Sequence, residues 1–242
     1  MNIFESWIVT KPIAHRGLHD EQCPENSLAA FGKAIENNYA IEIDLRSLAD
    51  GTIVVFHDET LGRMTGRDGY LANLKFEDIR DLKLGKSNEH IPTLEQVLKF
   101  VNGKTPLLIE IKNMGKVGDF EKNIFKLLQN YKGEFAIQSF NPYTLLWFKI
   151  NAPQIRRGQL ASFMKKSNLP FFKKRSLKRM SLNKKVSEPN FIAYDCNNLP
   201  NRFVKKYKDL PLLAWCVRTD EEYNRVKKYC DNIIFENIRP IV

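Results

Sequence analysis

The chain has 242 residues, of which 43% are apolar, so it is long enough to bury the core of one large domain or two small ones. It contains no long apolar run, and its first residues lack the pattern of a cleavable signal, so we expect a soluble, cytoplasmic protein. The four cysteines lack the spacing of a metal-binding motif and are too sparse for a disulfide framework, so we expect reduced thiols.

The net charge of +10 comes from one segment of the chain. Residues 135–187 contain twelve lysines and arginines and no acidic residue, whereas the rest of the chain holds 26 basic and 28 acidic residues. The protein is nearly neutral outside this segment. An inference about anionic partners therefore applies to the segment alone.

Short apolar runs alternate with amphipathic stretches along most of the chain. The strand-like runs lie around Ile13 and Ile41 and at residues 107–111, 135–137, 158–160, 191–193, 212–217 and 233–235. The helix-like stretches are residues 27–37, 94–101, 117–131, 142–150, 202–208 and 220–229. Repeated strand–helix units of this number predict a (β/α)8 TIM barrel, with a doubly wound open sheet as the alternative. We find no linker and no repeat, and expect a single domain spanning 1–242.

Two segments depart from the alternation. Residues 58–91 are rich in turns and then helical around 76–84, and residues 163–187 form a basic insert after the sixth predicted strand. Both follow strands, so we expect both as excursions near the carboxyl-end face of the barrel, where active sites are built.

Residues 40–57 predict a hairpin that carries acidic residues and a histidine. Apolar and acidic side chains alternate in its first strand, so Glu42 and Asp44 share one face. Asp50-Gly51 is a strong signal for a two-residue turn, and an apolar run follows it. With that turn, paired residues have numbers that sum to 101, which places Asp44 opposite His57. The returning strand is then an extra arm after the second barrel strand.

Two other strand ends carry compatible groups. His15, after the first run, can transfer a proton near neutral pH, and Arg16 offers a guanidinium suited to phosphate. A lone histidine at such a place is more often a solvated loop residue. The run at 107–111 brings Glu110 and, on the same side, Lys112. Such a pair is usually a surface ion pair or a satisfied pair in the core.

These strand ends together supply three acids, Glu42, Asp44 and Glu110, and two histidines. An oxygen-rich ligand set suits Mg2+ or Ca2+ better than zinc. A divalent cation together with Arg16 and Lys112 would neutralise a phosphodiester. The two histidines could then act as general base and general acid.

The chain resembles the glycerophosphodiester phosphodiesterase family. The matching residues keep the family's order and are His15-Arg16-Gly17, Pro24-Glu25-Asn26-Ser27, Phe31, Glu42-Ile43-Asp44, Asp50-Gly51, Val55-Phe56-His57-Asp58, Leu61, Arg63, Thr65, Gly69, Ile91-Pro92-Thr93-Leu94-Glu95, Glu110-Ile111-Lys112, Ser139-Phe140 and Trp215. The first half of this set is highly specific, and the second half is looser.

The resemblance implies a (β/α)8 barrel that cleaves glycerophosphodiesters to sn-glycerol 3-phosphate and an alcohol. It implies one divalent cation, Mg2+ or Ca2+ with Mn2+ as a further candidate. It also implies that a glycerol hydroxyl attacks phosphorus and that water opens the resulting cyclic phosphate. The implied site residues are the metal ligands Glu42, Asp44 and Glu110, the acid/base pair His15 and His57, the phosphate-binding Arg16 and Lys112, and Trp215 beside the glycerol.

Two late motifs depart from the family pattern. Many members have Trp-Thr-Val-Asn where this chain has Trp215-Cys216-Val217-Arg218. The family's terminal Ile-Thr-Asp-x-Pro corresponds here to residues 233–240, which are longer and lack Thr-Asp. The departures leave the metal and histidine assignments intact and concern the leaving group and the substrate.

The basic insert mixes nine lysines and arginines, between residues 163 and 185, with phenylalanines and methionines. It is either a solvated excursion or a patch that contacts an anionic membrane surface, since cations with apolar anchors bind such surfaces. No recognition motif points to nucleic acid. Two rival functions stay open: a lysophospholipase D-like phosphodiesterase acting on lipid at a membrane, and a non-catalytic barrel that binds phosphate or a polyanion.

Overall fold

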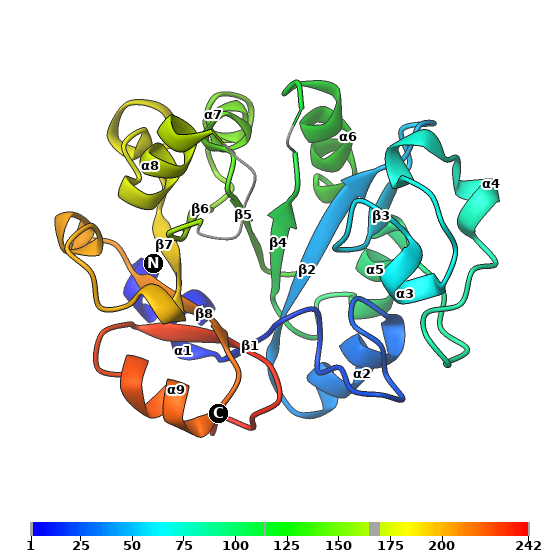
Figure 1. Ribbon diagram of the computed structural model, residues 1–242, viewed down its shortest axis with the longest axis horizontal. Helices are drawn as coiled ribbons and strands as arrows, with labels where there is room; N and C mark the ends of the chain where they lie inside the picture. Colours follow the sequence, from blue (N-terminus) through cyan, green and yellow to red (C-terminus); the bar gives the residue numbers. More distant parts are fainter. Residues whose placement is uncertain (1, 114, 165–169, 242) are drawn as a thin grey trace. The chain divides into compact units, whose positions relative to one another are not determined.

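The computed structural model describes residues 2–113, 115–164 and 170–241 (Figure 1). The chain divides into two compact units. The N-terminal unit is Ala14–Phe135, and the C-terminal unit is Ala136–Val242 together with Met1–Ile13.

The N-terminal unit is built around the parallel pair of strands β2 and β4. Its strands are β1 (Ile13–Ala14, at the boundary), β2 (Ala40–Ser47), β3 (Ile53–Val55) and β4 (Leu107–Ile111). Its helices are α2 (Leu28–Glu36), α3 (Gly62–Thr65), α4 (Phe76–Ile79), α5 (Leu94–Val101) and α6 (Asp119–Leu128), with a 3-10 turn at Leu71–Asn73. Strand β2 pairs in parallel with β4 and antiparallel with β3.

The C-terminal unit contains five strands that follow one another across a sheet. They are β5 (Phe135–Ser139), β6 (Arg157–Ala161), β7 (Phe191–Asp195), β8 (Leu212–Val217) and β9 (Asn232–Phe235). The pairings from β5 to β9 are parallel. The helices are α1 (Trp7–Thr10), α7 (Pro142–Asn151), α8 (Phe171–Arg179) and α9 (Asp220–Val226), with helical turns at Ile3–Glu5, Asn183–Ser187, Cys196–Asn198 and Val204–Tyr207.

The order of strands and helices is that of a (β/α)8 barrel once β3 is set apart as an arm. The predicted fold class is therefore confirmed. Each strand-like run forms a strand, and the helix-like stretches form helices, except that residues 202–208 contain only the 3-10 turn Val204–Tyr207. Parallel strands read clearly in this sequence because they are buried on both faces and so appear as continuous apolar runs.

Side-chain caps set the starts of the two helices that precede β2 and β4. The hydroxyl of Ser27 accepts a hydrogen bond from the Ala30 N–H at 3.1 Å, at the start of α2. Thr93 and Gln96 cap each other reciprocally at the start of α5. The buried residues of α5 lie at helical spacing and form one apolar stripe: Leu94, Val97, Leu98 and Val101.

The hairpin arm is present, but its predicted register was wrong by one residue. Paired residues of β2 and β3 have numbers that sum to 100, which puts Asp44 opposite Phe56 rather than His57. The cause is the length of the loop. The Leu48 N–H donates to the Thr52 carbonyl at 2.9 Å, so the loop has three residues and ends on a glycine with φ of +83°. Such a loop replaces the two-residue turn that Asp-Gly suggested.

Residues 58–91 pack against the arm through a small apolar core. The buried residues of this core are Leu48, Val54, Phe56, Leu61, Leu71, Ile79, Leu84 and Ile91. The arm therefore joins β2 to residues 58–91, which we call the excursion. The excursion packs against the strand end that precedes His57.

The basic insert is described in part, because residues 165–169 of the predicted segment lie outside the described residues. Helix α8 contains no buried residue. Within this helix, the ammonium of Lys178 lies 4.0 Å from the ring centre of Phe163. Among the described residues, no helix combines the length and apolarity needed to cross a membrane.

Replacing Gly158 with alanine should destabilise the protein. A Cβ at this position of β6 would lie 2.1 Å from the ring of Phe191, which is fully buried. We expect a loss of roughly 1–3 kcal/mol in the free energy of unfolding, measured by denaturant titration. Gly62→Ala is the control, because a Cβ there meets nothing within 4 Å. Equal stability of the two variants would contradict this packing.

Candidate active site

Three buried carboxylates meet where β2 and β4 run side by side. Glu42 and Asp44 are neighbours on one face of β2, and the parallel register sets Asp44 beside Glu110 of β4. The exposed fractions of the three residues are 1%, 0% and 8%, and one carboxylate oxygen from each lies within 4.8 Å of the others. The structure therefore brings the predicted trio of acids together inside the N-terminal unit.

Two cations contact this acidic cluster. The Lys112 ammonium is 3.1 Å from Asp44 Oδ1 and donates to Glu110 Oε1 at 2.8 Å. The Arg16 Nε is 3.1 Å from Asp44 Oδ2, and the Arg16 backbone N–H donates to Glu42 Oε2 at 3.1 Å. Each carboxylate thus has a polar hydrogen nearby, which partly compensates its loss of hydration.

Asn26 ties the loop before α2 to the acidic cluster. Its Nδ2 donates to Asp44 Oδ2 at 2.9 Å, and the Asp44 N–H donates to Asn26 Oδ1 at 3.3 Å. The Asn26 N–H donates to the Arg16 carbonyl at 2.9 Å. The neighbouring Ser27 caps the start of α2. Asn26 instead positions Asp44.

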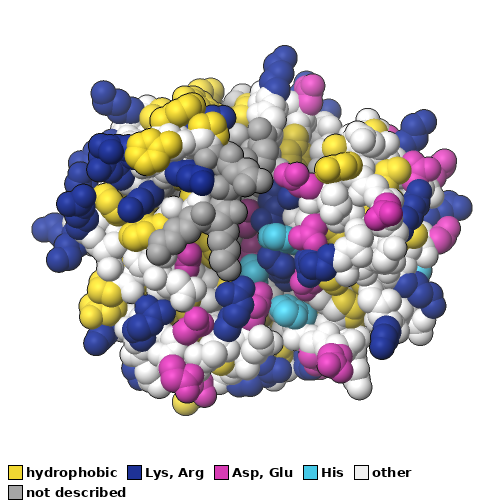
Figure 2. Space-filling model, viewed as in Figure 1, with side chains coloured by type: hydrophobic (Ala, Val, Ile, Leu, Met, Phe, Trp, Pro, Cys, Tyr) yellow, Lys and Arg dark blue, Asp and Glu magenta, His cyan; other side chains and the backbone are white. Residues whose placement is uncertain are grey.

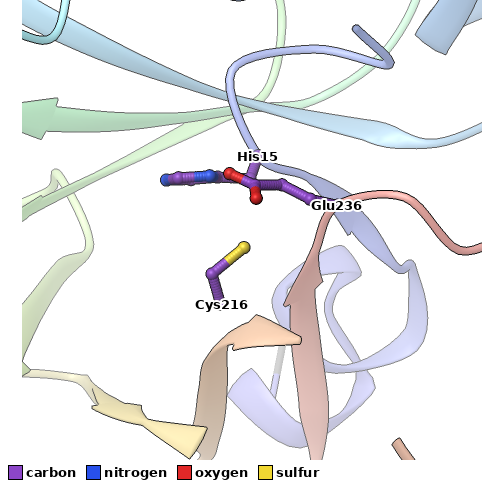
Figure 3. Close-up of side chains that lie close together, drawn as sticks. All are labelled: His15, Cys216 and Glu236. Atoms are coloured by element: carbon purple, nitrogen blue, oxygen red, sulfur yellow. The ribbon is translucent and has the colours of Figure 1, made fainter. Parts of the chain in front are cut away.

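The two predicted histidines lie at two strand ends: His15 begins the loop before α2, and His57 ends the hairpin arm. His15 directly follows β1 (Figure 3), and its Nε2 is 3.9 Å from Glu42 Oε2. His57 follows the arm, and its Nδ1 is 2.6 Å from Asp58 Oδ1. Because an ionised carboxylate only accepts hydrogen bonds, this contact favours a proton on Nδ1. The Nε2 of a neutral His57 is then a proton acceptor.

A chain of ion pairs links His57 to Arg16. The Asp58 carboxylate accepts from Arg63 Nε at 2.6 Å, and Arg63 donates to Glu25 at 2.7 and 2.8 Å. Glu25 in turn accepts from Arg16 Nη1 at 2.7 Å. Since Arg63 lies in α3, the excursion takes part directly in holding both ends of the site.

The three acids differ in how tightly they hold protons. Burial, with the nearby charges of Asp44 and Glu110, raises the pKa of Glu42 well above its ordinary value. Burial also raises the pKa of Glu110. Burial alone would raise the pKa of Asp44, but Lys112 and Arg16 outweigh it and hold that pKa below its ordinary value. Asp44 is therefore the carboxylate that stays ionised most readily.

Burial lowers the pKa of His57 to about 4, against the opposing attraction of Asp44. The imidazole is therefore neutral at pH 7. Burial would lower the pKa of Lys112 as well, but Asp44 and Glu110 raise it above its ordinary value. Lys112 thus remains a cation beside the acids.

The acidic cluster fits a divalent cation. All three side chains offer oxygen ligands, which hard cations prefer. Asp44 Oδ1 is buried and accepts no hydrogen bond from the residues that the structure describes, although the Lys112 ammonium is 3.1 Å away. Three carboxylates beside Lys112 and Arg16 leave negative charge when all are ionised, and a bound cation would offset it.

The last predicted site residue, Trp215, lies on β8 of the C-terminal unit. Its indole Nε1 donates to the Ala193 carbonyl at 3.0 Å. Its ring packs edge-to-face on Phe140, with centroids 5.6 Å apart. These two contacts fix the orientation of the indole within its own unit.

The two late motifs that depart from the family pattern contact each other. Arg218, after β8, donates from Nε to Glu236 Oε2 at 2.7 Å. The Glu236 N–H also donates to the Val217 carbonyl at 2.9 Å. Figure 3 shows Cys216 near the end of β8 and Glu236 directly after β9. The altered motifs therefore form one linked feature, which could not be seen from either motif alone.

The glycerophosphoryl diester phosphodiesterase family matches residues 15–238 of the chain. The chain belongs to this family. A glycerophosphodiester phosphodiesterase of Caldanaerobacter subterraneus is 37% identical over 162 residues, covering 62% of this chain and 66% of the relative. Another from Bacillus altitudinis is 30% identical over 167 residues, covering 63% and 66%.

Solved structures of phosphodiesterases share the fold over nearly the whole chain. An Oleispira antarctica phosphodiesterase in complex with the product sn-glycerol 3-phosphate has a TM-score of 0.81 at 23% identity, covering 96% of this chain and 94% of that one. A glycerophosphodiester phosphodiesterase from Thermotoga maritima has a TM-score of 0.72 at 22% identity, covering 92% of each chain. The likeness supports the same fold class.

Sequence reasoning assigned no role in the site to several residues that organise it. Asn26, Glu25 and Arg63 matched motifs of the phosphodiesterase family, but nothing local showed what they contact. Asn26 reaches a residue 18 positions away, and Glu25 reaches Arg63 across 38 positions. The only available signal was the opposite charge of Glu25 and Arg63 inside matching motifs.

A divalent cation should raise the melting temperature of the wild-type protein by several degrees, because it binds the folded cluster and offsets repulsion among its carboxylates. Glu110→Gln should lose most of this rise, since it removes one ligand charge. Glu95→Gln, at an exposed carboxylate of α5, is the control and should keep it. Thermal melts with and without Mg2+ or Ca2+ measure the effect. An equal rise in the wild type and Glu110→Gln would contradict the assignment of the cluster.

Proposed function

We propose that the chain hydrolyses glycerophosphodiesters to sn-glycerol 3-phosphate and an alcohol, with one divalent cation. The observation that carries the proposal is the cluster of Glu42, Asp44 and Glu110 beside Lys112 and Arg16. Family membership supports the same reaction. The product bound by the Oleispira antarctica phosphodiesterase supports the same substrate class. Because the family match runs from residue 15 to 238, we propose that the chain acts as one domain.

In this proposal the three carboxylates hold the cation, and the cation supplies Lewis-acid polarisation of the phosphate. Mg2+ or Ca2+ fits an all-carboxylate ligand set, with Mn2+ as a further candidate. Lys112 and Arg16 add positive charge for the remaining phosphate oxygens, and the planar Arg16 guanidinium suits a two-point contact. Trp215 is proposed to flank the glycerol.

His15 and His57 are proposed to move the protons. Cleavage of a phosphodiester requires one proton to leave the attacking hydroxyl and one to reach the departing oxygen. His57 is neutral at pH 7, and its contact with Asp58 leaves Nε2 free of its own proton. His15 lies buried next to Glu42 and is the second acid/base group.

Replacing His57 with alanine should lower kcat for glycerophosphodiesters roughly 10²–10⁴-fold, the usual contribution of a positioned acid/base group. Release of sn-glycerol 3-phosphate measures the loss, and circular dichroism checks that the variant folds. His15→Ala should behave alike. His90→Ala is the control, because that histidine is exposed and belongs to none of the contacts of the site. Turnover by His57→Ala at the wild-type rate would overturn the mechanism.

The same assay separates the enzyme from its rivals. A non-catalytic phosphate-binding barrel would release no product with Mg2+, Ca2+ or Mn2+. Full activity after EDTA treatment, with metal removal checked by elemental analysis, would contradict the role of the carboxylates. Lysophospholipids tested beside water-soluble glycerophosphodiesters decide whether lipids are substrates.

We also propose that the chain is cytoplasmic and contacts an anionic membrane surface through α8, where lysophospholipids would be reached. Phe171 and Phe172 start this helix and are 78% and 67% exposed, and Lys173, Lys174 and Arg175 follow them. Figure 2 shows lysine and arginine side chains next to hydrophobic ones over this part of the molecule. Exposed aromatic anchors beside cations suit the headgroup region of anionic lipids.

The double variant Phe171→Ser/Phe172→Ser should bind anionic vesicles roughly tenfold more weakly, because it removes two apolar anchors. Cosedimentation with phosphatidylserine-containing vesicles at low salt measures this binding. Ile150→Ser is the matched control, since Ile150 is 68% exposed but lies on α7. The membrane role would be wrong if the wild type did not bind, or if the double variant bound as the wild type does.

A further inference from the structure

A second feature of the N-terminal unit is a cavity of about 310 Å³ that adjoins the acidic cluster. This volume lies in the range of small-molecule sites, roughly 300–1,000 Å³. Its lining residues come from the carboxyl end of β2, from the excursion, from the described residues that follow β4 and from the first turn of α6. The lining side chains that bear on its chemistry are Arg46, Glu59, Tyr70, Lys112, Lys116 and Phe120.

The cavity shares one side chain, Lys112, with the groups that would hold the phosphate. Lys112 lines it while also contacting Asp44 and Glu110. Arg46 lies two residues beyond Asp44 on the same face of β2, and its Nε donates to the His57 carbonyl at 2.7 Å. A substrate whose phosphate contacts Lys112 would therefore extend one of its two ester groups toward this space.

The charged side chains of the lining are three basic residues and one acid, and most of the remaining lining surface is apolar. Glu59 is its acidic side chain, and its carboxylate lies 3.8 Å from Arg46 Nη1. Lys112 is matched by the acids of the cluster. Lys116 is exposed and forms no ion pair with any residue that the structure describes. A cationic group entering the cavity would therefore meet uncompensated positive charge, whereas hydroxyl oxygens would meet donors.

Hydrogen bonds with Asn113 hold the backbone at Gly115 and Lys116. Asn113 is buried, and its Nδ2 donates to Glu121 at 2.7 Å and to the Lys116 carbonyl at 3.2 Å. Its Oδ1 accepts from the Gly115 N–H at 2.8 Å. Tyr70, from the excursion, also lines the cavity and is 60% exposed, although it adjoins the buried Leu71. The lining thus combines basic side chains with aromatic ones.

We propose that this cavity binds the departing alcohol and selects polyols such as glycerol or inositol over alcohols that carry an ammonium group. The proposal rests on the proposed function and names the part of the substrate that varies. Its specificity determinant is Lys116, which repels an ammonium group and donates to a hydroxyl. The aromatic rings of Tyr70 and Phe120 cover the carbon faces of the polyol.

The test compares kcat/KM for four substrates: glycerophosphoglycerol, glycerophosphoinositol, glycerophosphocholine and glycerophosphoethanolamine. The enzymes are the wild type, Lys116→Glu and Lys122→Glu, at one fixed ionic strength. Lys122 is an exposed lysine of α6 outside the cavity, so both variants change the net charge equally. We expect the wild type to prefer the two polyol substrates about fivefold or more, the size of effect that charges a few ångströms apart have in water.

Lys116→Glu should remove or reverse this preference, mainly by improving the ammonium substrates, while Lys122→Glu keeps it. The inference is overturned if the wild type shows no preference, if both variants behave alike, or if Lys116→Glu lowers all four values equally. The last result would place the common glycerol group in the cavity. A wild type that turns over none of the four substrates would instead refute the proposed function itself.

Discussion

Burial of three carboxylates at one point is the constraint on which the rest of the N-terminal unit depends. Glu42, Asp44 and Glu110 repel one another and have lost most of their hydration. Lys112 and Arg16 compensate part of this cost, and the amide of Asn26 orients Asp44. The parallel register of β2 and β4 makes the meeting of the acids unavoidable. With all three acids ionised the cluster keeps an excess of negative charge, which is unfavourable for stability alone and which a bound cation would offset.

The excursion after the arm belongs to the same arrangement. Its apolar core packs on Phe56, and its Arg63 connects Asp58 to Glu25. Through these ion pairs the orientation of the His57 imidazole is coupled to that of the Arg16 guanidinium, although the two residues lie far apart in the chain. Such a network acts as a unit, so removal of one member is expected to affect the others more than the sum of separate contacts suggests.

Sequence patterns predicted the eight strands and the acids at their ends because both leave local signals. Strand period places Glu42 with Asp44, and apolar runs mark buried parallel strands. The register of the arm failed because Asp-Gly signals a turn without setting its length, and one extra loop residue moved Phe56 into the place expected for His57. The hydrogen bond from Asn26 to Asp44 and the ion pair of Arg218 with Glu236 join segments that are distant in the sequence. Local spacing does not encode such contacts.

The central claim is that Glu42, Asp44 and Glu110 hold one divalent cation. Anomalous diffraction from crystals grown with Mn2+ tests it most directly, because the ion can be located without assumptions about activity. We expect one anomalous peak bonded to an oxygen of each of the three carboxylates, at roughly 2.0–2.6 Å. Density for a cation elsewhere, with these carboxylates uncoordinated, would contradict the account.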